Sequence, residues 1–523
     1  MSGSQGLARA GLIVSGAFLV SRVLGYVRLV VIGNTFGVTP ELDAFFAAFR
    51  LPDLIFQLVA AGALSSAVIP IVSALFTTNE PSRAWRVVST VINLMLIGLV
   101  VLAVGLFILA PVIVPVITPG FGPAELDRTI ELTRIMLLSP IFLALGAVAT
   151  SVLNSGGRFM AAAMAPIVYN LAIIGAALVL GPTLGVKGLA LGVVAGSMGH
   201  LLIQLRPLGR MGFRYQPRIE AEDPQARRAL ILMAPRAIGL GATQITFIVV
   251  TSLATLLGAG AVSDFNFAFA MLHIPLGIIG VPLGIVLLPS LSREAAEGNE
   301  AGFASLLTRA LRLLIYVMIP IAVLTAIARQ PLVEILFGSG KIGQSDLDLI
   351  ALTLAYLLIG LTAHALIAVL ARAFYARQDT VTPVVAAVAA VGINTTLAIV
   401  LVAPLGLGGI ALAIAIAAWM EALSLIVVLR RRLPLLSLAG MGRVALQAMA
   451  GSLVAGAITL VVLQTMGERL GPDASRLLLL VQVTLAGAAF GLVYAVISLA
   501  LRIPELPTIV GVMVDVFRRP RRA

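Results

Sequence analysis

The chain has no cysteine, only three histidines and few charged residues. Without cysteine it can form neither a disulfide nor a thiolate metal site. The histidines, at positions 200, 273 and 364, are too scattered to suggest a metal centre. Charged residues make up 11% of the chain, whereas an ordinary soluble domain has about 25%. This composition cannot cover the surface of a 523-residue soluble protein, so lipid must cover much of it.

Motifs for catalysis and for nucleotide hydrolysis are also missing. We find no Ser-His-Asp set, no HExxH and no paired carboxylates at a usable spacing. The closest approach to a phosphate-binding loop, Gly338–Lys341, has the wrong spacing and is not followed by Ser or Thr. The sequence therefore predicts a protein that is not an enzyme, needs no cofactor or metal, and draws any transport energy from gradients.

Long apolar stretches dominate what is present, since 60% of the residues are hydrophobic. A transmembrane helix needs about 20 mostly apolar residues. That window gives fourteen candidate spans, near residues 10–33, 44–75, 88–116, 129–153, 160–181, 188–205, 230–257, 265–289, 309–328, 349–374, 381–402, 407–429, 441–466 and 477–501. The first stretch lacks a cleavage site, so we read it as a span and not as a signal peptide. The predicted fold class is an all-α integral membrane protein.

The basic residues predict the orientation of these spans. With a cytoplasmic N-terminus and alternating sides, one face receives 24 of the 35 Lys and Arg residues and the opposite face 6. Basic residues collect in cytoplasmic loops, so both termini are predicted to be cytoplasmic. The net charge of +12 is then mainly a topology signal and an attraction to anionic lipid, and no nucleic-acid partner is expected.

An internal repeat is visible at a separation of about 220 residues. The segment Leu184–Leu191 is similar to Leu405–Leu412, and three further pairs keep nearly the same offset: Pro70 with Pro289, Pro166 with Pro383, and Asn170 with Asn394. Six spans per unit make the halves parallel, related by a pseudo-two-fold axis along the membrane normal. The predicted domains are an N-lobe (1–208), a C-lobe (209–432), two additional helices (433–501) and a basic cytoplasmic tail (502–523). Such halves suit a transporter that works by alternating access.

Ionisable residues inside the first two spans are the candidates for function, because a charge in a span costs about 2.5–3.5 kcal/mol. Arg22 and Arg28 lie in the first span. Asp43 and Arg50 lie in the second, two turns apart on one helix face, and Pro52 should kink this span just after Arg50. Guanidinium groups suit phosphate oxygens and remain charged in a dry site. The alternative is that the arginines reach a headgroup layer, which is hard for Arg22 and easier for Arg28 and Arg50. Gly25 could permit a local distortion between the first two arginines.

Two polar residues in later spans are candidates for ion coupling. Glu421 lies deep in the twelfth span without an obvious partner, so it is either protonated or part of such coupling. Asn394, which pairs with Asn170 in the repeat, is the second candidate.

Five motifs stand out along the chain: Ser21–Arg28, Glu41–Pro52, Gly62–Pro70, Gly280–Ser292 and Phe374–Pro383. They resemble motifs of the MurJ (MviN) lipid II flippases, which belong to the multidrug/oligosaccharidyl-lipid/polysaccharide exporter superfamily, and the resemblance covers about residues 10–430. It implies fourteen helices in the same order and export of the lipid-linked peptidoglycan precursor across the bacterial cytoplasmic membrane. It also implies roles for the residues that match: Ser21, Arg22, Arg28 and Arg50 in substrate binding, and Asp43, Gly25, Pro52, Gly62 and Ser65 in gating or orientation.

The chain departs from the family pattern where Leu29, Phe56, Gln57, Ala61 and Ala270 replace family charges. The carboxylates of a sodium site in some members would fall near Val250 and Ala398, so that site is expected to be absent.

Four hypotheses follow for the function. The first is a lipid II flippase, expected as a monomer with lipid II and membrane lipids as partners. The second is an exporter of another undecaprenyl-pyrophosphate-linked oligosaccharide, and the third is a scaffold for envelope assembly that transports nothing. A drug antiporter is the weakest, since a positive cavity repels cationic drugs.

Overall fold

The computed structural model describes residues 2–59, 63–78, 80–220, 222–224, 227, 241, 244–338, 340–470, 475–507 and 511. The regular elements of these residues are all helices, which confirms the all-α prediction. The chain forms two compact units, Met1–Ser263 and Asp264–Ala523. The first unit includes the helix Gln244–Thr255, whose Thr251 hydroxyl accepts a hydrogen bond from Arg50, as described below.

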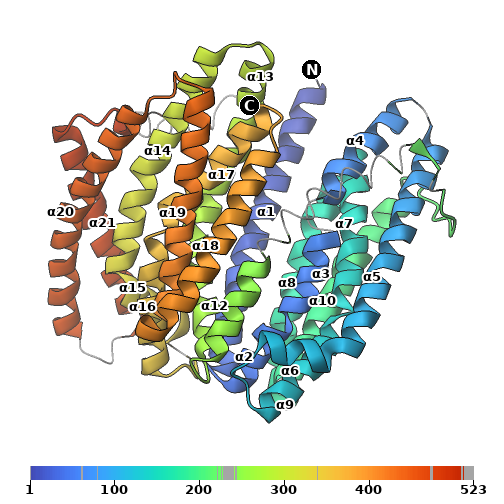
Figure 1. Ribbon diagram of the computed structural model, residues 1–523, viewed down its shortest axis with the longest axis horizontal. Coiled ribbons are helices and arrows are strands. Elements are labelled where there is room, and N and C mark those ends of the chain that lie inside the picture. Colours follow the sequence, from blue (N-terminus) through green and yellow to red (C-terminus); the bar gives the residue numbers. More distant parts are fainter. Residues whose placement is uncertain are drawn as a thin grey trace. The chain divides into compact units, whose positions relative to one another are not determined.

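The first unit is a bundle of antiparallel helices with short connections (Figure 1). Helix α8 packs against α1 and α10, and α7 packs against α4 and α10. The labelled helices are α1 (Ser2–Phe36), α2 (Pro40–Ala48), α3 (Arg50–Val59), α4 (Ala63–Thr77), α5 (Pro81–Ile117), α6 (Pro123–Met136), α7 (Ser139–Ser155), α8 (Phe159–Val179), α9 (Gly181–Leu184) and α10 (Val186–Gly209).

The second unit packs α17 against α13, α14 and α19, while α20 and α21 lie against each other and α20 lies against α14. Its helices are α12 (Ala261–Pro275, which begins in the first unit), the π-helix η1 (Leu276–Gly280), α13 (Val281–Ala296), α14 (Glu300–Ile327), α15 (Arg329–Phe337), α16 (Gln344–Leu358), α17 (Leu361–Ala376), α18 (Val381–Leu405), α19 (Leu407–Arg432), α20 (Leu438–Leu470) and α21 (Arg476–Ala500).

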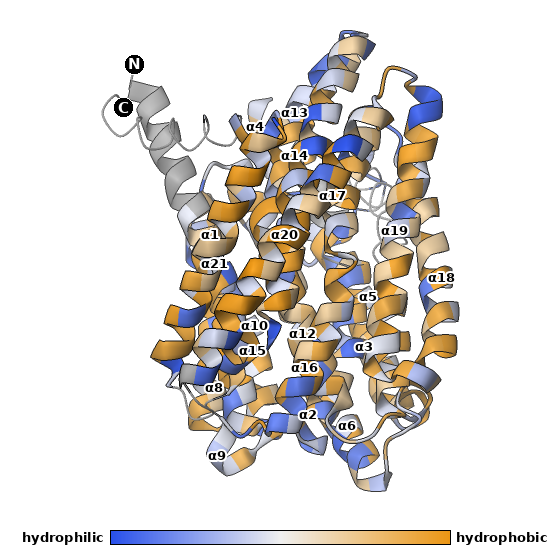
Figure 2. Ribbon diagram, turned by 90° about the vertical axis from the view of Figure 1, so that its left-hand side faces the viewer, coloured by the Kyte–Doolittle hydropathy of each residue, from blue (hydrophilic) through white to orange (hydrophobic). Residues whose placement is uncertain are grey.

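Apolar side chains cover the outward faces of these helices. Figure 2 shows hydrophobic residues along the middle of the helices and hydrophilic residues gathered toward their ends. On α5, for example, Ile108, Val112 and Val116 are each about two thirds exposed or more. Exposed apolar surface of this extent requires a nonpolar solvent, so these faces contact lipid.

Eleven helices of the described residues are long and apolar enough to cross a membrane, and α16 with α17, bent by 46°, meets the same criteria when the two are taken together. The chain is therefore a multi-pass membrane protein. Two predicted spans, 44–75 and 230–257, contain residues outside the described part. Their described portions are helices α2 to α4 and the helix Gln244–Thr255.

The second predicted span is broken, as its proline suggests. Helix α2 ends at Ala48, and α3 begins at Arg50, two residues before Pro52. Proline has no N–H to donate to the carbonyl four residues earlier, which here belongs to Ala48, and its ring crowds that carbonyl. The Ala48 oxygen instead accepts a long hydrogen bond (3.5 Å) from the Thr133 hydroxyl of α6. The break thus falls just before Arg50, where the sequence predicted it just after.

The repeat motif builds the same joint twice. Gly185 and Gly406 both have positive φ, 58° and 55°, which only glycine adopts without strain. A Cβ added to Gly188 would clash with Leu180, and one added to Gly409 would clash with Leu401. These glycines let α10 approach α8 and let α19 approach α18 closely. The local geometry of the two joints therefore agrees with the repeat, while the symmetry of whole lobes stays a prediction.

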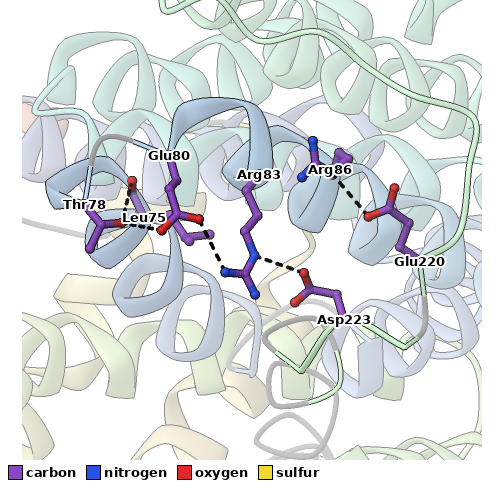
Figure 3. Close-up of polar contacts among 7 residues, drawn as sticks. All are labelled: Leu75, Thr78, Glu80, Arg83, Arg86, Glu220 and Asp223. Carbon is purple, nitrogen blue, oxygen red and sulfur yellow. Dashed lines mark hydrogen bonds and ion pairs between the residues drawn. The ribbon is translucent and has the colours of Figure 1, made fainter.

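After α10 the chain runs back along α5 as an extended segment, here called the strap (residues 213–220 and Asp223). The Asn93 amide donates to the carbonyls of Gln216 (3.0 Å) and Arg218 (2.8 Å) and accepts from the Tyr215 hydroxyl (2.6 Å). Ion pairs extend the contact at its far end. Figure 3 shows Arg83 between Glu80 and Asp223, and Arg86 beside Glu220.

Candidate functional site

Asp43 is fully buried on α2 and binds the start of a helix more than 200 residues later. Its carboxylate accepts hydrogen bonds from the backbone N–H of Gly260 (2.6 Å) and Ser263 (2.8 Å) and from the Ser263 hydroxyl (2.6 Å). The N-terminal N–H groups of a helix lack partners within it and favour negative charge. Asp43 therefore caps α12, and its oxygens are occupied by this contact. The sequence predicted that Asp43 orients an arginine or gates a cleft, and these partners include no arginine.

Arg50, the first residue of α3, contacts the helix Gln244–Thr255 at two points. Its Nε donates to the Thr251 hydroxyl (2.8 Å), and its guanidinium carbon lies 5.3 Å from the centre of the Phe247 ring. Such a cation–π contact holds a guanidinium without neutralising it. One turn later, Asp53 accepts a hydrogen bond from the Gln244 amide (2.7 Å). Together these contacts attach α3 to this helix.

Arg28 joins α1 to the same region. Its guanidinium carbon lies 5.8 Å from the centre of the Tyr169 ring on α8. Tyr169 interacts electrostatically with both Arg28 and Asp53, so residues from α1, α3 and α8 lie near one another. Among the described residues, no carboxylate lies within ion-pair distance of Arg28. The structure thus brings Arg28 and Arg50 to one polar region of the first unit, here called the arginine cluster (Arg28, Arg50, Asp53, Tyr169, Gln244 and Thr251).

Arg22 lies six residues earlier on α1, and it is exposed. It interacts electrostatically with Tyr26, one turn along the same helix. Ser21 contributes its backbone, because its carbonyl accepts a hydrogen bond (3.2 Å) from the Asn170 amide of α8. Helix α1 is continuous through Gly25, where the side of the helix that a Cβ would occupy is open. The helix therefore aims Arg22 and Arg28 in directions about 120° apart.

The remaining candidates do not join the arginine cluster as described. Pro52 is buried and breaks the second span. Gly62 lies outside the described residues, and Ser65 lies in α4 with its side chain outside the described part. In the second unit, Asn394 is buried in α18, and neither polar atom of its amide has a hydrogen-bond partner among the described residues. Glu421 is half-buried in α19, and its carboxylate has no hydrogen bond or ion pair with a described residue.

Apolar residues occupy three described positions at which members of the family have a charged residue. Val250 and Ala398 are both buried, at 1% and 0% exposure. Phe56 packs against the apolar core formed by α4, α5 and α7. Within the described residues, no group of three His, Asp or Glu side chains could hold a metal ion.

Sequence reasoning missed five members of the arginine cluster or its immediate contacts: Asp53, Tyr169, Gln244, Phe247 and Thr251. A signal existed for three of them, since Gln244, Phe247 and Thr251 recur at intervals of three and four and share one face of a helix. Tyr169 carried no such signal, because only the packing of α8 on α1 places its ring beside Arg28.

Two kinds of comparison place the sequence among known proteins. The family model described as lipid II flippase MurJ matches residues 32–479. The lipid II flippase MurJ of Burkholderia cenocepacia is 33% identical over 435 residues, which cover 82% of this chain and 84% of that protein. The probable lipid II flippase MurJ of Rhizobium tropici is 32% identical over 435 residues, covering 82% and 81%.

Solved structures share the fold. A lipid II flippase MurJ in an inward closed conformation superimposes with a TM-score of 0.79 at 22% identity, covering 94% of this chain and 99% of that one. An inward-facing multidrug resistance transporter of the MATE family superimposes with a TM-score of 0.67 at 18% identity, covering 79% and 95%. Both likenesses concern the fold alone.

Proposed function

Since this chain belongs to the family of MurJ lipid II flippases, we propose that it moves lipid II from the inner to the outer leaflet of the bacterial cytoplasmic membrane by alternating access. Lipid II carries a pyrophosphate between its lipid and its sugar–peptide headgroup. The protein must therefore offer positive charge inside the membrane while the lipid tail remains in the bilayer. The partners that this function requires are lipid II and membrane lipids, with the protein acting as a monomer.

The charge balance of the arginine cluster carries the proposal. Arg28 lies against the Tyr169 ring. Arg50 donates to Thr251, lies against the Phe247 ring and interacts electrostatically with Asp53. Asp53 is the one carboxylate in the cluster, whereas Asp43 is occupied by the start of α12. With Arg22 on the same helix as Arg28, the net charge is positive. Guanidinium groups held in this way are suited to pyrophosphate oxygens.

The cap that Asp43 places on α12 suits a gate. Its three hydrogen bonds join the second span to the segment Gly260–Ser263, which leads into α12. Hydrogen bonds to a carboxylate are strong, yet they exchange with water when the site is hydrated. We expect this contact to form when the non-cytoplasmic side is closed and to break when that side opens.

The topology we propose has fourteen spans with both termini cytoplasmic. It consists of two six-helix lobes, 1–208 and 209–432, followed by two helices and a basic tail. The eleven long helices, the bent pair α16–α17 and the helices within 44–75 and 230–257 support this count. The distribution of arginine supports the orientation.

The test compares two intramembrane arginines in a lipid II transport assay with proteoliposomes. Arg28→Gln removes one charge from the cluster, and loss of one charge-assisted contact is expected to slow transport about tenfold or more. Arg134→Gln is the matched control, because Arg134 also stacks on a ring, that of Phe107 (4.8 Å), and lies on α6 outside the cluster. Equal rates for both variants and the wild type would contradict the assignment of Arg28.

A second experiment tests the alternative cargo, because several charges of the family pattern are missing from this chain. Phe56 packs into the core and Gln57 bonds to Asp53, where basic residues were expected. Native mass spectrometry of the purified protein identifies the bound lipid. Lipid II supports the proposal, and another undecaprenyl-pyrophosphate-linked glycan supports the alternative exporter. If neither lipid is transported and all three arginines can be replaced without loss in complementation, the protein is a scaffold.

A further inference from the structure

The second unit contains a cavity of about 550 Å³ at the end predicted to be cytoplasmic. Two turns surround it, one between α13 and α14 and the other between α17 and α18. Its lining includes the last residue of the motif 280–292 and part of the motif 374–383, and neither motif contributes to the arginine cluster. The lining residues are Ser292, Glu294, Ala295, Ala296, Gly298, Asn299, Glu300, Phe303, Tyr375, Ala376, Arg377 and Gln378.

Carboxylates and aromatic rings give this cavity a defined chemistry. Glu294 accepts a hydrogen bond from the Asn299 amide (2.7 Å), and Glu300 pairs with Arg377 (3.1 Å). The Arg377 guanidinium already stacks on Phe303, with its carbon 5.6 Å from the ring centre. Tyr375 is 43% exposed. The cavity therefore holds one arginine by an ion pair and a ring, and it presents Glu294 and Tyr375 to a second one.

The end of the chain is anchored close to this cavity. Glu505 is buried, and its carboxylate forms an ion pair (2.6 Å) with Arg312 on α14. Phe303, on the wall of the cavity, lies nine residues earlier on the same helix, which is about 14 Å along the axis.

The chain beyond this anchor is long enough and basic enough to enter the cavity. Residues 508–523 contain four arginines, at 518, 519, 521 and 522, and one acidic residue, Asp515. Twelve residues separate Pro507 from Arg519, and an extended chain of that length spans up to about 40 Å. The tail can therefore reach the cavity from Glu505 with length to spare.

We propose that the arginine-rich segment 518–522 docks in this cavity within the same molecule. A guanidinium of the tail pairs with Glu294 and stacks on Tyr375, as Arg377 pairs with Glu300 and stacks on Phe303. Docking holds together the α13–α14 and α17–α18 turns. The competing site for the same arginines is the anionic membrane surface, which attracts basic segments next to a span.

The absence of native cysteine makes a crosslinking test direct. Pro520→Cys in the tail is combined with Ala296→Cys, an exposed residue of the cavity lining, in the full-length protein in membrane vesicles, and a mild oxidant is added. Mass spectrometry of the linked peptides measures the yield of intramolecular disulfide. The control pairs Pro520→Cys with Leu435→Cys, an exposed residue of the α19–α20 connection that does not line the cavity.

Docking is expected to raise the yield of the cavity pair about tenfold over the control pair, because it raises the local concentration of the tail. Replacing the four tail arginines with glutamine, or Glu294 and Glu300 with glutamine, should abolish this excess, while the exposed Glu222→Gln should not. Raising the salt from about 0.1 M to 1 M should lower it as well. Three results would overturn the proposal: equal yields for both pairs, a high yield that ignores the charges, or linkage only between two copies of the chain.

Discussion

The two units differ most at the end that the arginine distribution predicts to be cytoplasmic. In the first unit the strap lies along α5, so that the chain itself covers this end. In the second unit the corresponding end of α14 borders the open cavity of about 550 Å³. The residues where these helices begin, Pro81 and Glu300, are 219 apart, close to the offset of the repeat.

The connections that follow the sixth helix of each half explain this difference. After α10 the chain stays extended and returns along α5, bonding to Ser89, Thr90 and Asn93. After α19 it turns within a few residues into α20, held by hydrogen bonds from Arg430 to the carbonyls of Pro434 and Leu436. Two repeats of similar sequence thus acquire different surfaces, because a connection that is not part of the repeat covers only one of them.

The largest effect is expected from Trp85→Ala beneath the strap. The Trp85 ring is buried between Phe76 and Phe213, with ring centres 5.2 and 5.5 Å apart, so its loss leaves a cavity and should lower the free energy of unfolding by about 3–5 kcal/mol. Trp419 is the one other tryptophan, half-buried on α19, and Trp419→Ala should cost less. Thermal unfolding of each variant, monitored by the fluorescence of the tryptophan that remains, measures both losses of stability. Equal losses of unfolding free energy in the two variants would contradict the expectation that Trp85 is packed more tightly than Trp419.

A smaller loss of stability is expected from Asn93→Leu, which weakens the contact between the strap and α5. This change removes three hydrogen bonds to the strap, two donated and one accepted, and should destabilise the contact by about 1–3 kcal/mol. Trypsin should then cleave after Arg214 and Arg218 at least several-fold faster in membrane vesicles. Ser437→Ala, in the α19–α20 connection, removes one weak hydrogen bond to Gly440 and should leave these rates unchanged. If cleavage is unaffected by Asn93→Leu, the strap is held by other contacts.

The smallest effect concerns Asp379, which caps α18 in the second unit. Burial alone would raise the pKa of its carboxyl, but hydrogen bonds from Thr382 and Arg432 outweigh burial and lower the pKa from 3.8 to about 2. The charged form therefore stabilises the fold above pH 4, and this stabilisation disappears as the pH falls from about 4 to 2. Asp379→Asn should reduce stability by about 1 kcal/mol or less at neutral pH.

The pH dependence separates this cap from a general loss of structure. Melting temperatures measured between pH 2 and pH 6 should fall with acid less steeply in Asp379→Asn than in the wild type. Identical slopes would contradict the role assigned to the carboxylate. Because the capped turn adjoins Gln378 on the cavity wall, the same variant also tests whether that turn matters for the shape of the cavity.

Much of the fold was predictable because the relevant forces act along the chain. Apolar runs long enough for a bilayer give the helices, and eleven of them have the required length in the described residues. Pro52 predicted the break in the second span, with an error of a few residues, because a missing N–H acts at a fixed distance along the helix. The glycines of the repeat predicted two matching joints for the same reason: the positive φ is a local property.

The candidate site was less predictable, because its contacts join residues far apart in sequence. Arg28 and Arg50 were expected as substrate ligands from their positions in apolar spans, and that role stays a prediction. Their partners Tyr169 and Thr251 are more than 100 residues away and are apolar or neutral, so no charge pattern identified them. Asp43 and Arg50, seven residues apart, were expected to share one helix face, but the break at Phe49 ends that face.

Two aspartates show what the sequence determined alone and what the tertiary structure decided. Asp379 stands before Thr-Val-Thr-Pro and caps the helix that follows, an arrangement that a few residues contain in full. Asp43 also caps a helix, but that helix begins 218 residues later, and its N–H groups reach the carboxylate only after α2 has packed. Short segments of the sequence determine local backbone geometry and the length of each apolar helix. The partner of a buried charge depends on which helices meet, because a carboxylate bonds to whatever donor packing brings within about 3 Å.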